Sequence, residues 1–76
     1  MGTDLCTTDE ILSLRAQILV ARTADATTVQ RVAALLERFP DSPELWELHG
    51  EAIRLAEPGS GEAAKSFERA QSLRRL

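Results

Sequence analysis

Two interruptions divide the sequence into helical segments. Pro40 disfavours helical geometry in the residue before it, and Asp41-Ser42-Pro43 supplies a turn, a cap and a proline for the first turn of the next helix. The second interruption, Glu57-Pro58-Gly59-Ser60-Gly61, is the clearest helix breaker in the chain, and its serine can cap the following helix. These signals predict one helix at about 43–56 and another from residue 62 to the end.

The sequence before Pro40 contains two further helix starts. Thr7-Thr8-Asp9-Glu10 has the form of a capping box, which predicts a helix extending to about Arg22. The next helix begins after Asp25 or Thr27 and ends at Phe39. Leu and Ala are abundant and aromatic residues are few, as in helical domains. We therefore predict an all-α chain of four antiparallel helices in a single domain, residues 1–76, with residues 1–7 as a flexible tail.

The predicted helices differ in how their apolar residues are arranged. The helix at 43–56 has an apolar half-circle, which indicates packing on two sides, and a separate polar ridge of Glu44, Glu47, Glu51 and Arg54. The first helix has two apolar strips, so one of them is expected to lack a partner within the chain. The strips are Ile11, Leu14 and Ile18 on one side, and Leu12, Ala16, Leu19 and Val20 on the other.

The second half of the chain resembles a tetratricopeptide repeat, a helix-turn-helix unit of about 34 residues. The residues that match in order and approximate spacing are Trp46, Gly50, Ile53, Ala63, Phe67 and Ala70. Residues 9–42 form a degenerate unit, in which Leu12, Ala16 and Leu19 take the places of Trp46, Gly50 and Ile53. The resemblance implies two stacked helical hairpins, 9–42 and 43–76. A plain four-helix bundle is the alternative.

The small residues in this pattern have a physical meaning of their own. Gly50 in one unit, and Ala16 in the other, would let two helix backbones approach closely. Ala63 and Ala70 would offer small surfaces on the facing helix, while the Trp46 and Phe67 rings fill the remaining volume.

The resemblance also implies a binding groove. In tetratricopeptide domains the first helix of each pair lines a concave surface that holds peptides. Carried over by register, this partner-binding groove would contain Glu10, Ser13, Gln17, Glu44, Glu47, Glu51 and Arg54. Such a mostly acidic groove favours a basic or amphipathic peptide or helix. We therefore expect a non-catalytic protein-interaction module. Chaperone co-factors of this family bind a C-terminal carboxylate with Lys, Arg and Asn residues, and because these are mostly missing here, we do not expect that mode of binding.

Self-association is a second expectation. Two units form only a small stack, whereas about three repeats are usually needed for stability. A homodimer, or addition to a larger assembly, would compensate. The residues expected to mediate it are Ile11, Leu14, Ile18 and Val20.

The composition argues against other functions. With His49 and Cys6 as the only histidine and cysteine, the chain has no evident nucleophile–base set, zinc cluster or internal disulfide, so we expect no enzyme, cofactor or metal and a cytoplasmic location. We expect no membrane partner, because no apolar run reaches the roughly 20 residues of a membrane span. The net charge of −3 disfavours nucleic acid. The alternative function is a small helical regulator that contacts nucleic acid through Lys65, Arg69, Arg74 and Arg75.

Overall fold

The computed structural model describes residues 10–75, and all regular elements in this range are helical. The first helix, residues 10–20, consists of α-helical residues 10–15 followed by the π-helical turn η1 (Ala16–Val20). α2 (Ala26–Arg38), α3 (Pro43–Ala56) and α4 (Glu62–Arg74) follow it. The predicted all-α class is confirmed. The capping box at Thr7 and the predicted tail, residues 1–7, lie outside the described residues.

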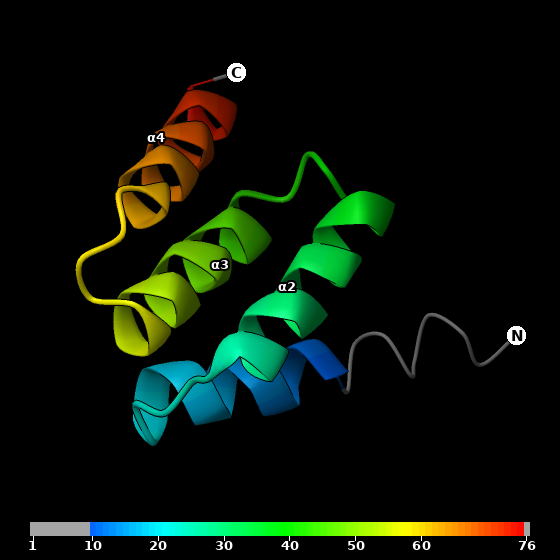
Figure 1. Ribbon diagram of the computed structural model, residues 1–76. Coiled ribbons are helices and arrows are strands. Elements are labelled where there is room, and N and C mark those ends of the chain that lie inside the picture. The colour runs from blue at the N-terminus through cyan, green and yellow to red at the C-terminus, as the bar shows by residue number, and fades with distance from the viewer. Residues whose placement is uncertain (1–9, 76) are drawn as a thin grey trace, which may run out of the picture.

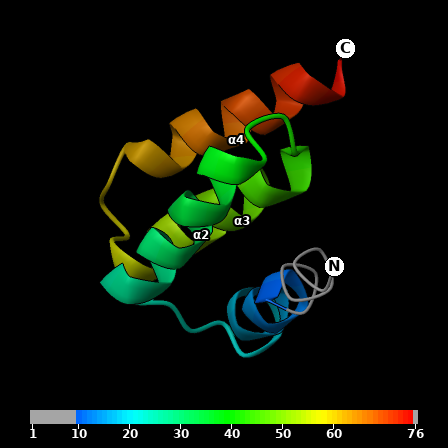
Figure 2. The ribbon, with the colours of Figure 1, turned by 90° about the vertical axis from the view of Figure 1, so that its right-hand side faces the viewer.

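The helices are arranged around α3. Figure 1 shows α3 between α2 and α4, with these three helices running in alternating directions. Figure 2 shows the first helix on the side of the molecule away from α4. α3 contacts all three other helical elements, which agrees with the apolar half-circle in its sequence.

The ends of α2 follow from its sequence. Asp25 is the N-cap, and its carboxylate accepts hydrogen bonds from the Thr28 backbone N–H at 2.9 Å and from the Thr28 hydroxyl at 3.1 Å. These hydrogen bonds to Thr28 hold the pKa of the Asp25 carboxyl below its ordinary value of 3.8. Asp25 rather than Thr27 therefore starts this helix, and Arg38, two residues before Pro40, ends it.

Serines stand at the starts of the other two helices. The Ser42 hydroxyl accepts from the Leu45 backbone N–H at 3.4 Å, as expected of an N-cap followed by proline. The Ser60 hydroxyl accepts from the Glu62 backbone N–H at 3.2 Å, although Gly61 occupies the cap position itself. Ser60 thus satisfies one free amide of α4, as predicted, although it lies one residue before the N-cap position.

The π-helical turn in the first helix was not predicted. Its wider ring is closed by the Ala21 backbone N–H, which donates to the Ala16 carbonyl at 2.9 Å. Arg22 then adopts a left-handed conformation with φ of 58°, and the Thr23 backbone N–H returns to the Gln17 carbonyl at 3.0 Å. Left-handed residues of this kind commonly close helices. The first helix therefore ends at Val20, two residues earlier than predicted.

The hydrophobic core lies on the side of α3 that meets α2 and the first helix. Its members are nearly all branched aliphatic residues, as expected for close packing between helices. They are Leu14, Ile18, Val32, Leu35, Leu36, Leu45, Leu48 and Ala52, with Ile11, Ala24, Val29, Trp46 and Leu55 packed against them.

α4 packs on the opposite side of α3 through small residues. Ala63, Ser66 and Ala70 are its buried residues, in agreement with the role predicted for the two alanines. A Cβ atom built on Gly50 would lie 2.9 Å from the Phe67 ring, so a larger residue at this position would displace the ring. Ala16, predicted to play the same part in the first helix, is exposed, because that face of the helix turns toward solvent.

We expect Gly50→Ala to destabilise the protein. Alanine is the better helix former by about 1 kcal/mol, but overpacking against the Phe67 ring costs about 1–3 kcal/mol, so the net loss is about 1 kcal/mol. In a Phe67→Ala background the clash is absent, and the same substitution should add about 1 kcal/mol. Urea unfolding of the four proteins measures both effects. A loss of equal size in the two backgrounds would show that the ring is not the cause.

Candidate functional site

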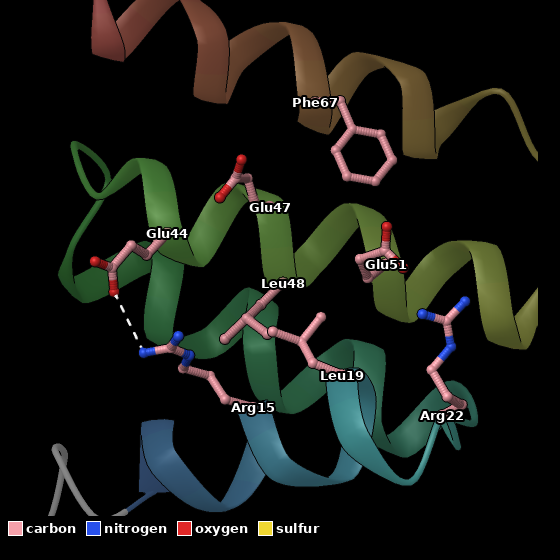
Figure 3. Close-up of a pocket in the computed structure, with 8 residues that line it drawn as sticks. All are labelled: Arg15, Leu19, Arg22, Glu44, Glu47, Leu48, Glu51 and Phe67. Atoms are coloured by element: carbon pink, nitrogen blue, oxygen red, sulfur yellow. Dashed lines mark ion pairs between the residues drawn. The ribbon is translucent and has the colours of Figure 1, made fainter.

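An open cavity of about 310 Å³ crosses the surface of α3 between the first helix and α4 (Figure 3). We call it the groove. α3 forms its base, α4 contributes one wall, and the first helix with the residues just after it contributes the other. Its lining residues are Arg15, Leu19, Arg22, Glu44, Glu47, Leu48, Glu51 and Phe67.

Three helices each contribute one apolar side chain to the groove. Leu48 comes from α3 and is also a buried member of the core, so the core side chains hold it in place at the base of the groove. Leu19 faces the groove from the first helix and is 42% exposed. The Phe67 side chain points into the groove from α4 (Figure 3). The groove can therefore bury apolar groups of a ligand.

Charged side chains of opposite sign surround this apolar lining. Glu44, Glu47 and Glu51 follow one another along α3, about one turn apart. Arg15 and Arg22 stand on the first-helix side, and the Arg15 guanidinium lies 3.9 Å from the Glu44 carboxylate (Figure 3). The lining thus carries three carboxylates and two guanidinium groups.

Two further arginines bind the carboxylates from outside the lining. The Arg74 guanidinium donates to both oxygens of Glu47 at 2.6 Å each, which ties the end of α4 to the first half of α3. Arg54 lies 3.4 Å from Glu51 on the same helix. The Arg74 and Glu47 side chains are both about half exposed, and exposed ion pairs contribute only about 0–1 kcal/mol, so a ligand can replace this pair.

The structure gathers only part of the predicted partner-binding groove. Glu44, Glu47 and Glu51 line one cavity, whereas Arg54 reaches it only through its ion pair with Glu51. Ser13 is exposed on the first helix and does not line the groove.

The other two predicted residues of the first helix face α2 instead. The Glu10 carboxylate lies 3.7 Å from the Arg31 guanidinium, and the Gln17 side-chain amide donates to the Thr28 hydroxyl at 3.0 Å. They do not line this cavity, because the first helix is turned about its axis relative to the predicted register.

Sequence reasoning missed the residues that form this wall, Arg15, Leu19 and Arg22. A signal for them exists in the sequence. They are spaced i, i+4 and i+7, which places them on one helical face beside the exposed apolar strip.

Comparisons of the chain with family models, with curated proteins and with solved structures found no match. The tetratricopeptide resemblance therefore stays a prediction from the sequence. The case for the groove rests on its own geometry and charge.

The residues predicted for self-association divide between core and surface. Leu14 and Ile18 are 1% and 0% exposed, because this strip packs against α2 and α3, so they cannot meet a second copy. Ile11 is half-buried against the same core. Val20 alone of the four is well exposed, at 80%. Within residues 10–75, the strip of Leu12, Ala16, Leu19 and Val20 is the one that stays exposed.

His49 packs between α3 and α4. Its Nδ1 lies 2.7 Å from the hydroxyl of buried Ser66, and its ring meets the Trp46 ring edge-on with centroids 6.1 Å apart. Burial lowers the pKa of His49 below its ordinary value of 6.5, while the negative charge of Glu62 opposes this shift. The described residues contain no group of three His, Cys, Asp or Glu side chains placed to hold a metal ion, and Cys6 lies outside them.

We expect the stability of the protein to fall as the pH drops below about 6.5. Because the pKa of His49 is lower in the folded than in the unfolded state, the unfolded state binds the extra proton first. Stability should be fully present above pH 6.5 and decrease until the folded-state pKa is passed, where it levels off. Urea unfolding between pH 5 and 8 tests this, with His49→Leu as the control, which should lack this pH-dependent step. An unchanged step in His49→Leu would assign the effect to other groups.

The basic side chains proposed for nucleic acid are partly engaged within the protein. The Lys65 ammonium lies 3.8 Å from Glu62, and Arg74 binds Glu47. Arg69 and Arg75 are exposed on α4 and directly after it. Nothing in this arrangement strengthens the nucleic-acid alternative.

The described helices include none with the length and apolar character needed to cross a membrane.

Proposed function

We propose that this protein is a non-catalytic protein-interaction module whose groove binds an amphipathic segment of a partner protein. The observation that carries the proposal is the apolar lining of Leu19, Leu48 and Phe67 with charged side chains around it. An amphipathic helix offers the matching surface, since its apolar side chains form one stripe with charged residues at its edges.

Charge favours a basic segment. Three carboxylates line the groove, and the whole chain has a net charge of −3. Arg54 and Arg74 pair with Glu51 and Glu47 from outside the lining, so a basic segment would bind these carboxylates by displacing those arginines. Complementary charge speeds encounter and selects among partners. Arg15 and Arg22 would at the same time favour an acidic residue on one edge of the segment, which would fix its direction in the groove.

A selection experiment tests the proposal. A phage-displayed library of amphipathic helices is selected on the immobilised protein, and the enriched peptides are titrated into the isotope-labelled protein by NMR. We expect the peptides to be enriched in Lys and Arg, and to shift the signals of Leu19, Glu51 and Phe67. Gln30, exposed on α2, serves as the reference position. Shifts confined to the surface around Gln30 would contradict the proposal.

The solution mass of the protein tests a second copy as the occupant. We expect a monomer by sedimentation equilibrium, because Leu14 and Ile18, two of the four residues expected to mediate a homodimer, are buried in the core. The contrary result is a dimer that dissociates when Val20 is replaced by Asp and that binds no selected peptide. The exposed strip of Leu12 and Val20 would then serve self-association, and the proposal would be wrong.

A further inference from the structure

The ion pair between Arg74 and Glu47 has the geometry of specific arginine recognition. Both terminal nitrogens of the guanidinium donate to the carboxylate, one to each oxygen, at 2.6 Å. Such paired, charge-assisted hydrogen bonds are stronger and more directional than a single contact. The groove carboxylate at Glu47 is therefore already arranged to receive a planar fork.

The position of Arg74 makes this contact easy to open. Arg74 is the last residue of α4, and helix ends fray readily. The side chains of Arg74 and Glu47 are each about half exposed, so water can replace the contact. Glu47 lines the groove, whereas Arg74 does not.

We infer that the groove binds an arginine side chain of the partner segment, and that Arg74 occupies the Glu47 carboxylate when no partner is bound. The inference rests on the proposed function and names the chemistry of the residue that the groove recognises. The aliphatic stem of an incoming arginine would lie along Leu19 and Leu48, and its guanidinium would replace that of Arg74. Lysine lacks the planar fork and would bind less well.

Small probes test this without a known partner. Hexylguanidinium, hexylammonium and hexanol are each titrated into the isotope-labelled protein, and dissociation constants are measured from the NMR shifts of Leu19 and Phe67. The proteins compared are the wild type, Arg74→Gln, Arg69→Gln and the double variant Glu47→Gln/Arg74→Gln. Arg69→Gln is the matched control, because it removes the same charge from an exposed position on the same helix. Circular dichroism checks that all four are folded.

We expect Arg74→Gln to bind hexylguanidinium up to about fivefold more tightly than the wild type, because Glu47 is released from an exposed ion pair worth at most about 1 kcal/mol. Hexylammonium should gain less than hexylguanidinium, Arg69→Gln should change either constant by at most about twofold, and the double variant should lose the gain. Equal effects of Arg74→Gln and Arg69→Gln, or equal gains for the two cations, would overturn the inference.

Hexanol separates this inference from the proposed function. If hexanol shifts Leu19 and Phe67 but removal of Arg74 gives guanidinium no advantage, the groove stands and the arginine inference is wrong. If none of the three probes shifts these residues, both the groove and the arginine inference fall.

Discussion

Replacing Ile18 by aspartate is expected to prevent the chain from folding. Ile18 is 0% exposed and belongs to the core formed by the first helix, α2 and α3. The change removes packing worth about 2–5 kcal/mol and places a carboxylate among the apolar side chains of the core, at a further cost of several kcal/mol. A domain of this size has a total stability of roughly 5 kcal/mol. Far-UV circular dichroism should therefore show loss of the helical signal.

Val20→Asp is the matched control for this experiment. It introduces the same charge two positions further along the same helix, at a side chain that is 80% exposed. We expect its free energy of unfolding in urea to stay within about 0.5 kcal/mol of the wild type. If Ile18→Asp instead folds with wild-type stability, the first helix does not pack through this strip.

Leu19→Asp is expected to abolish binding in the groove while leaving the fold intact. Leu19 supplies apolar lining opposite Glu47 and Glu51, so the new carboxylate removes apolar contact and adds repulsion. Loss of a central apolar contact typically costs 2 kcal/mol or more, which weakens binding by about 30-fold or more. Because Leu19 is 42% exposed, the free energy of unfolding should change little. Isothermal titration calorimetry with a selected peptide measures the loss.

Leu12→Asp is the control for the binding experiment. Leu12 lies on the same helix and is 56% exposed, but it does not line the groove. We expect its dissociation constant to stay within about threefold of the wild type, since an exposed charge outside the site acts only through screened, long-range repulsion. Equal losses from Leu12→Asp and Leu19→Asp would place the binding surface on the outer strip.

The helices of this chain could be predicted because the ends of each helix are set by residues next to them in the sequence. Asp25 and Ser42 bind backbone amides three residues later, and Pro40 and the segment around Gly59 interrupt the pattern. These are short-range effects that depend on neighbouring residues alone. The predicted range 43–56 for α3 accordingly matches the structure.

The orientation of the first helix could not be predicted in the same way. Its two strips are similarly apolar, and periodicity alone does not show which one meets α2 and α3. The repeat register placed Glu10 in the groove, whereas the structure places Arg15 of the same helix there, five positions later. Five residues correspond to a rotation of about 140°. Tertiary packing decides this angle. Glu44, Glu47 and Glu51 line the cavity together because they share the polar ridge of α3, whereas Arg54 of the same ridge does not line it.

The π-helical turn at Ala16–Val20 makes the wall of the groove sensitive to chain length. Such a turn accommodates one residue more than a regular α-helical turn. Deleting Val20, whose side chain is almost entirely in solvent, would restore the regular pitch and bring Arg22, which follows the end of the helix, one residue closer to Leu19 along the chain. Leu14 and Ile18 precede the deletion and would keep their places. A single-codon deletion, with no substitution, is therefore enough to remodel this wall while sparing the interior.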